Sequence, residues 1–136
     1  MANRKIDDIE GIGPAIGEKF RNAGVKDTDT LLAKAATPAA RKALATAAGL
    51  TDAQILKFAN MADLYRVKGI GSEYSELLEA AGVDTVPALA RRNAANLTAA
   101  LAQANEARKL ARRAPNEAEV TRWIEEAKAL PRVLEY

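Results

Sequence analysis

The tripeptide Gly-Ile-Gly occurs twice in this sequence, at residues 11–13 and 69–71, and of all its patterns it is the one best suited to chemistry. Glycine permits the positive φ angles of a tight turn, and a helix that begins after such a turn has backbone N–H groups without intrahelical partners. Those amides and the helix dipole attract phosphate oxygens. The pattern predicts phosphate contacts at Gly11, Ile12, Gly13, Gly69, Ile70 and Gly71. The alternative is a purely structural turn with its isoleucine in the core.

A second feature is a concentration of positive charge between residues 86 and 113. The segment contains six cations and a single anion, so its local net charge is +5 in a chain whose total is +2. The six are Arg91, Arg92, Arg108, Lys109, Arg112 and Arg113. Such a segment is suited to phosphate groups, to RNA or to an acidic protein.

The helix expected within this segment decides how its cations are arranged. If Asn105 caps a short helix, Arg108 and Arg112 form one stripe and Lys109 and Arg113 form another, each pair one turn apart. The alternative is that these cations form ion pairs with the next helix. Its carboxylates are Glu117, Glu119, Glu125 and Glu126.

The residue types that are absent exclude several kinds of catalysis. The sequence contains no histidine and no cysteine, so it has no imidazole base, no thiolate nucleophile and no zinc ligand of either type. No nucleophile with a matching base can be identified, and we expect a protein that is not an enzyme and has no cofactor. The carboxylates of Asp7, Asp8 and Glu10 match no dedicated metal loop, and we expect them to be helix N-terminal charges.

An internal repeat organises the chain. Residues 9–25 return as residues 67–83, with both glycines of Gly-Ile-Gly and the closing Ala-Gly-Val matched at an offset of 58. After a short insertion in the second copy, residues 51–58 resemble residues 116–123. Phe58 and Trp123 occupy corresponding positions, so we expect both in the core.

The composition and the helix start and stop signals favour an all-α fold. Apolar residues make up 49% of the chain and almost half of them are alanine, while aromatic residues reach 4%, which favours closely packed short helices over strands. Proline at the start and glycine at the end of a helix, and Ser, Thr or Asn at its N-cap, set the expected boundaries of nine or ten short helices. The corresponding signals are Pro14, Gly24, Thr37, Thr51 and Asn116.

These elements predict one compact domain over residues 1–136. Repeat one spans about 1–64 and repeat two about 65–136, with the helix around 52–64 closing the first and opening the second. Each repeat alone would bury too little apolar surface to fold independently. No window is apolar enough to span a bilayer and the N-terminus lacks a signal-peptide core, so we expect a cytoplasmic protein without membrane contact.

Two resemblances add to this interpretation. Residues 9–25 and their second copy resemble the helix-hairpin-helix motif of DNA repair and recombination proteins, whose hairpin amides bind phosphates without reading sequence and whose hairpin carbonyls hold a monovalent cation. Across nearly its whole length the chain resembles a bacterial family catalogued as domain of unknown function 4332. The motifs that carry this second resemblance include residues 69–74, 82–86, 89–93 and 109–113. It implies a fold and no established activity.

The charges near the turns oppose a DNA-binding function. The first Gly-Ile-Gly turn is preceded by Asp7, Asp8 and Glu10, and Lys19 is a cation near it. The second turn is preceded by Lys68. Glu73, Glu76 and Glu79 follow the second turn as an exposed stripe that repels phosphate. Two hypotheses remain, of which we prefer the first: a module that binds DNA or RNA backbone without sequence preference, and a protein-interaction adaptor for an acidic partner.

Overall fold

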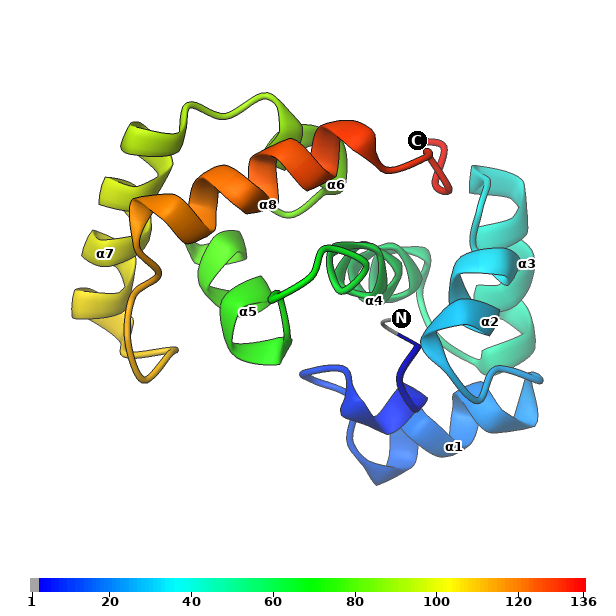
Figure 1. Cartoon of the computed structure of the whole chain (residues 1–136). Coiled ribbons are helices and arrows are strands. Elements are labelled where there is room, and N and C mark those ends of the chain that lie inside the picture. The colour runs from blue at the N-terminus through cyan, green and yellow to red at the C-terminus, as the bar shows by residue number, and fades with distance from the viewer. Residues whose placement is uncertain (1–2) are drawn as a thin grey trace.

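Within residues 3–136, which the computed structural model describes, the chain folds into eight α-helices and one 3-10 turn, with no strand (Figure 1). The elements are η1 (Ile6–Asp8), α1 (Pro14–Asn22), α2 (Thr28–Lys34), α3 (Pro38–Ala48), α4 (Asp52–Leu64), α5 (Ser72–Ala80), α6 (Val86–Ala90), α7 (Ala94–Arg108) and α8 (Glu117–Ala129). An isolated antiparallel bridge joins Lys5 to Asp27. The all-α prediction is confirmed.

The helix boundaries follow the local signals in the sequence. Pro14 opens α1, and Gly24 follows its end with a φ of +85°, a left-handed conformation that glycine adopts without strain. Thr37 caps α3 through a hydrogen bond from the amide of Ala40. Reciprocal capping boxes open α4 and α8, where the N-cap side chain and the residue three positions later exchange hydrogen bonds with each other's backbone.

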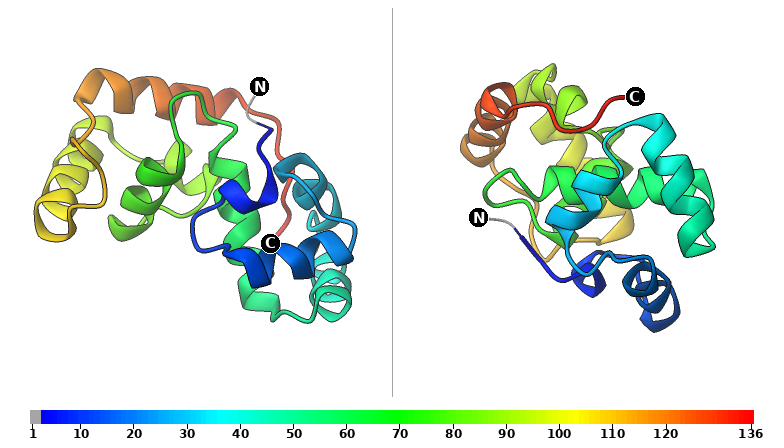
Figure 2. Two further views of the ribbon diagram at one scale, coloured as in Figure 1. Left: turned by 90° about the horizontal axis from the view of Figure 1, so that it is seen from below. Right: turned by 90° about the vertical axis from the view of Figure 1, so that its right-hand side faces the viewer.

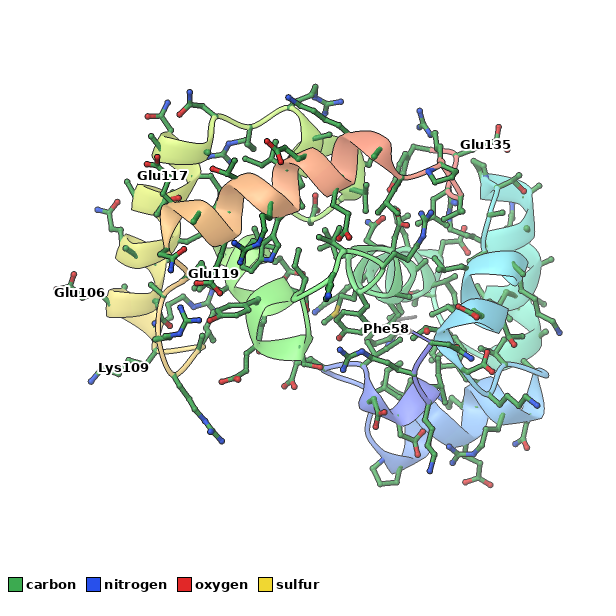
Figure 3. The ribbon with its side chains drawn as sticks, viewed as in Figure 1. Phe58, Glu106, Lys109, Glu117, Glu119 and Glu135 are labelled. Atoms are coloured by element: carbon green, nitrogen blue, oxygen red, sulfur yellow. The ribbon has the colours of Figure 1, made fainter. Side chains whose placement is uncertain are left out.

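Helix α4 lies in the middle of the molecule, with α1–α3 on one side and α5–α8 on the other (Figures 1 and 2). The buried apolar residues form two clusters, one centred on the first repeat and one on the second. Phe58, labelled in Figure 3, lies in the first cluster at 4% exposure. Trp123 lies in the second at 3%, so the prediction that both are core residues is confirmed. That neither repeat folds alone stays a prediction.

Residues 131–136 leave α8 and cross to the first repeat (Figure 2). Leu134 is buried among the residues of the first cluster, and the amide of Glu135 donates to the carbonyl of Ala36 at 2.7 Å. The buried guanidinium of Arg41 donates from Nη1 to the carbonyl of Ala35 at 2.9 Å and from Nη2 to that of Glu135 at 2.7 Å. This terminal segment therefore joins the second repeat back to the first.

The predicted short helix after Asn105 is wrong. Helix α7 continues through Asn105 to Arg108, and Lys109 then adopts a left-handed φ of +52°, which ends it. The Asn105 side chain accepts a hydrogen bond from the amide of Ala111 at 2.9 Å, so it stabilises the turn that follows α7. Because residues 109–113 are not helical, the two predicted stripes of cations do not form.

Candidate nucleic-acid interface

The two Gly-Ile-Gly segments form nearly identical turns, here named turn 1 (residues 10–13) and turn 2 (residues 68–71). The first glycine of each has a positive φ, +91° at Gly11 and +94° at Gly69. The isoleucine amide donates to the carbonyl three residues earlier at 3.1 Å in both turns, and both isoleucines are buried. The sequence prediction that Ile12 and Ile70 pack into the core is confirmed.

The first glycine of each turn lies against the aromatic residue at the corresponding position of its repeat. A Cβ atom placed on Gly11 would lie 3.4 Å from the ring of Phe58, and one on Gly69 would lie 3.1 Å from Nε1 of Trp123. A side chain at either position would need a disfavoured φ, and at Gly69 its Cβ atom would also crowd the indole ring. The repeat therefore pairs a glycine with an aromatic residue through tertiary structure.

The helices after the two turns, α1 and α5, differ from the other six at their N-termini. In α2, α3, α4, α6, α7 and α8 a side chain of the N-cap residue accepts a hydrogen bond from the first helical turn. Helices α1 and α5 have Gly13 and Gly71 as N-caps and no side-chain cap. Their first N–H groups are left without a capping oxygen from the described part of the chain.

The start of α5 contacts η1, the 3-10 turn that precedes turn 1 in the first repeat. The hydroxyl of Ser72, the first residue of α5, donates to the carbonyl of Asp8 at 3.0 Å, 64 residues earlier in the chain. The same hydroxyl oxygen lies 3.1 Å from the hydroxyl of the buried Tyr65. The polar hydroxyl of Tyr65 suggests a surface position when only the sequence is considered, but the residue is 1% exposed and its ring lies in the core.

Carboxylates surround turn 1. Asp7 forms an ion pair with Arg21 at 2.7 Å, and Lys19 donates to the carbonyl of Gly49 at 3.4 Å, so neither nearby cation is free of a partner. Burial, and then the negative charge of Glu10, raises the pKa of Glu76 on α5. Glu76 of α5 therefore adds negative charge close to Glu10 of turn 1, an effect that the sequence, which placed these glutamates after the second turn, did not predict.

Turn 2 has a different charge environment. The guanidinium of Arg4 lies 5.0 Å from the centre of the Tyr65 ring, and a Cβ atom on Gly71 would lie 3.4 Å from its Nη2. The backbone N–H of Lys68 donates a hydrogen bond to a carboxylate oxygen of Glu126 on α8. Two cationic side chains and one carboxylate thus meet at turn 2.

The basic segment does not form one patch. Arg91 and Arg92 precede α7, whereas Arg108, Lys109 and Arg112 lie at its other end, and 15 helical residues separate the groups by roughly 22 Å. Lys109 projects outward from the lower end of α7 (Figure 3). The hydroxyl of Tyr74 donates to the carbonyl of Arg113 at 3.3 Å, so this second group lies beside the first turn of α5.

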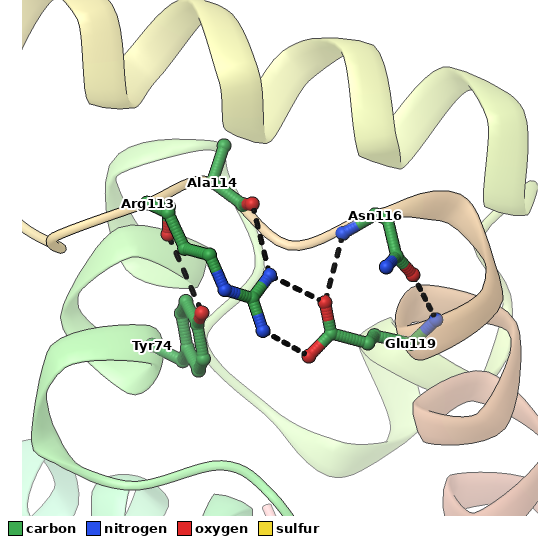
Figure 4. Close-up of polar contacts among 5 residues, drawn as sticks. All are labelled: Tyr74, Arg113, Ala114, Asn116 and Glu119. Atoms are coloured by element: carbon green, nitrogen blue, oxygen red, sulfur yellow. Dashed lines mark hydrogen bonds and ion pairs between the residues drawn. The ribbon is translucent and has the colours of Figure 1, made fainter.

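Arg113 differs from Arg108, Lys109 and Arg112 because it forms an ion pair with a residue of α8. Its Nη1 and Nη2 donate to the two carboxylate oxygens of Glu119 at 2.7 and 3.0 Å, and Glu119 also accepts from the amide of Asn116 at 3.0 Å (Figure 4). Of the predicted pairings with the next helix, the one with Glu119 is confirmed. Arg108, Lys109 and Arg112 make no ion pair with any described residue.

The Glu119 network predicts a pH dependence of stability. Hydrogen bonds from Arg113, and then from the Asn116 amide, lower the pKa of Glu119 from 4.5 to about 2. The carboxylate therefore adds stability above about pH 4.5 that is lost as the pH falls toward about 2. Because Arg113 is largely exposed, we expect Glu119→Gln to lower the free energy of unfolding by about 1 kcal/mol at neutral pH and by clearly less near pH 2, where part of the carboxylate is protonated.

Urea unfolding at both pH values measures this difference. Glu117→Gln is the matched control, because it removes the same charge from the first turn of α8 without touching Arg113. Equal effects of the two substitutions at neutral pH would show that the bidentate pair adds nothing beyond the helix dipole.

A groove of about 940 Å³ lies between the repeats, beside turn 2. Leu32 and Ala33 of α2 and Ala36 just after it line the groove, as does Leu130 at the end of α8. Arg4, Lys68 and Glu126 also line it. Among residues 3–136 no group of three acidic side chains could hold a metal ion, and no helix is long and apolar enough to cross a bilayer.

Three residues of this region are not evident from the sequence. Arg4 and Glu126 contact turn 2 although they are 67 and 58 residues away from their partners Gly71 and Lys68 along the chain. Ser72 follows turn 2 directly, but its hydroxyl contacts Asp8, 64 residues earlier. The repeat alignment places only Gly-Ile-Gly and its neighbours, so no local signal points to them.

The fold and the turns define a class of protein. It is an all-α chain of two repeats, each with a Gly-Ile-Gly turn before a helix that has no side-chain cap. The chain belongs to the family described as Domain of unknown function (DUF4332), which matches residues 10–130. The family resemblance expected from the sequence is confirmed, and the description assigns no activity. No curated protein and no solved structure matches the chain.

Proposed function

We propose that this protein is a non-enzymatic module that binds the phosphate backbone of DNA or RNA without sequence preference, using turns that act as helix-hairpin-helix motifs. The observation that carries the proposal is the pair of uncapped helix starts. Helices α1 and α5 alone, among those of residues 3–136, begin at a glycine without a capping side chain, and Ser72 joins the start of α5 to η1, which precedes turn 1. Paired amide clusters of this kind suit adjacent phosphates.

Cations from both repeats support the same surface. Arg4 and Lys68 lie at turn 2, and Lys109 and Arg112 lie in the segment that contacts α5 through Tyr74. Lys109 and Arg112 are exposed and make no ion pair, so a phosphate would meet them without displacing a carboxylate. Arg91 and Arg92 lie at the far end of α7 and are left out of the proposed surface.

Fluorescence anisotropy with duplex DNA, single-stranded DNA and RNA across a salt series tests the proposal. We expect micromolar or tighter binding at low salt and a linear fall of log K with log salt, as phosphate neutralisation requires. Lys109→Ala combined with Arg112→Ala is expected to weaken binding about tenfold and to make the slope less negative by about 2.

The matched control is Arg91→Ala combined with Arg92→Ala, which removes the same charge from the opposite end of α7. Its salt slope is expected to stay that of the unmodified chain. No binding of any probe at low salt would contradict the proposal, and equal effects of the two double variants would show that charge alone, not this surface, governs binding.

A second candidate function is a protein-interaction adaptor in which the turns are structural. The groove between the repeats favours it, because exposed or half-exposed apolar residues line it, among them Ala33 of α2, Ala36 just after α2 and Leu130 just after α8. The anisotropy series separates the two functions, since an adaptor shows no salt-dependent affinity for oligonucleotides.

A further inference from the structure

Turn 1 and turn 2 share one backbone conformation but not one set of contacts. Their first glycines have φ angles of +91° and +94°, and their isoleucine amides make the same hydrogen bond at the same distance. Among residues 3–136, only turn 2 has a backbone amide that donates to a side-chain carboxylate: the amide of Lys68 donates to Glu126, 58 residues away. The turn therefore forms without such a contact, and the fold does not require Glu126 to shape turn 2.

The repeat shows what replaces this contact at turn 1. Counted from the N-caps Thr51 and Asn116, the position of Glu126 in α8 corresponds to Met61 in α4. The position of Lys68 corresponds to Glu10 at the offset of 58. Turn 2, which contains Lys68, therefore has a carboxylate hydrogen-bonded to its backbone. Turn 1 has Glu10 in place of the lysine, and no described carboxylate is hydrogen-bonded to its backbone.

The carboxylate of Glu126 lies where positive potential is concentrated. The Lys68 ammonium has no hydrogen-bond or ion-pair partner among the described residues, and the Arg4 guanidinium is held over the Tyr65 ring beside Gly71. The uncapped start of α5 adds the positive end of its dipole. Arg4, Lys68 and Glu126 all line the open groove, so a solute reaches them without unfolding.

We propose that Glu126 competes with phosphate for turn 2. Its carboxylate accepts a hydrogen bond from the Lys68 amide, close to the positive charges of Arg4 and Lys68, and a phosphodiester binds there only when Glu126 moves away. This inference rests on the proposed function for the identity of the ligand. It assigns to one residue of α8 the control of how tightly turn 2 holds a backbone phosphate.

Glu126→Gln tests the competition, because glutamine keeps the size of the side chain and removes its charge. Glu125→Gln is the matched control: it removes the same charge one residue earlier in α8, where the side chain is exposed and makes no ion pair. We expect Glu126→Gln to tighten oligonucleotide binding at low salt about five- to tenfold, and Glu125→Gln to change it less than about twofold.

A second measurement does not depend on nucleic acid. Titration of each variant with inorganic phosphate, followed through the ¹H–¹⁵N resonance of Lys68, is expected to show a saturable shift at lower phosphate concentration in Glu126→Gln than in Glu125→Gln. The same spectra report that both variants are folded.

The outcomes separate the two proposals. If the chain binds oligonucleotides and the two variants bind alike, the competition is wrong and the proposed function stands. If no variant binds oligonucleotides, the proposed function fails, and the phosphate titration alone decides the competition. A Lys68 resonance that responds identically in both variants, or in neither, overturns it.

Discussion

Replacing Arg41 with methionine is expected to lower the free energy of unfolding by about 3 kcal/mol. Arg41 is 6% exposed, and its guanidinium donates at 2.9 and 2.7 Å to the carbonyls of Ala35 and Glu135. Methionine fills most of the same space but leaves both carbonyls without that charged donor. The loss is large because one side chain joins the second repeat's terminal segment to the core of the first.

Urea unfolding measures the change, and Lys42→Met is its matched control, since Lys42 is exposed on the same helix. We expect the control to stay within about 0.5 kcal/mol of the unmodified chain. Hydrogen exchange gives a local readout, because the amide of Glu135, bonded to the carbonyl of Ala36 at 2.7 Å, should lose protection in Arg41→Met. Unchanged protection there would show that Arg41 does not hold the terminal segment.

Replacing Gly69 with alanine is the prediction with the next largest effect, a loss of about 2 kcal/mol. The residue needs a φ of +94°, and its new Cβ atom would lie 3.1 Å from Nε1 of the buried Trp123. Strain and crowding therefore act together. Thermal or urea unfolding measures the loss.

The second glycine of the other turn supplies the control. Gly13 has a φ of −89°, and a Cβ atom there would have nothing within 4 Å, so Gly13→Ala is expected to cost less than about 0.5 kcal/mol. Similar losses for the two substitutions would contradict the pairing of the first glycine with an aromatic ring. They would indicate instead that any side chain disturbs these turns.

The sequence was sufficient wherever the determining partners lie within one helical turn. Thr51 with Gln54 and Asn116 with Glu119 are capping boxes in the structure, and α4 begins and ends where the repeat pattern placed it. The glycine turns and their buried isoleucines also follow from local pattern, because φ and hydrophobicity are properties of single residues.

Sequence reasoning failed where two local signals competed. Asn105 has the chemistry of an N-cap, but the alanine-rich run around it continues α7, and its side chain instead accepts from Ala111. Tyr65 has a polar group that suggests exposure, yet Ser72 satisfies its hydroxyl within the core. The predicted single basic cluster is divided because α7 is a long, straight spacer.

By itself the sequence determined that this chain is an all-α protein of two repeats with two Gly-Ile-Gly turns and no histidine or cysteine chemistry. Only the tertiary structure decided which charges meet those turns. Glu126 reaches Lys68 across 58 residues, and Ser72 reaches Asp8 across 64. The physical reason is that caps and turns depend on neighbours along the chain, whereas the electrostatic character of a surface depends on which helix faces packing brings together.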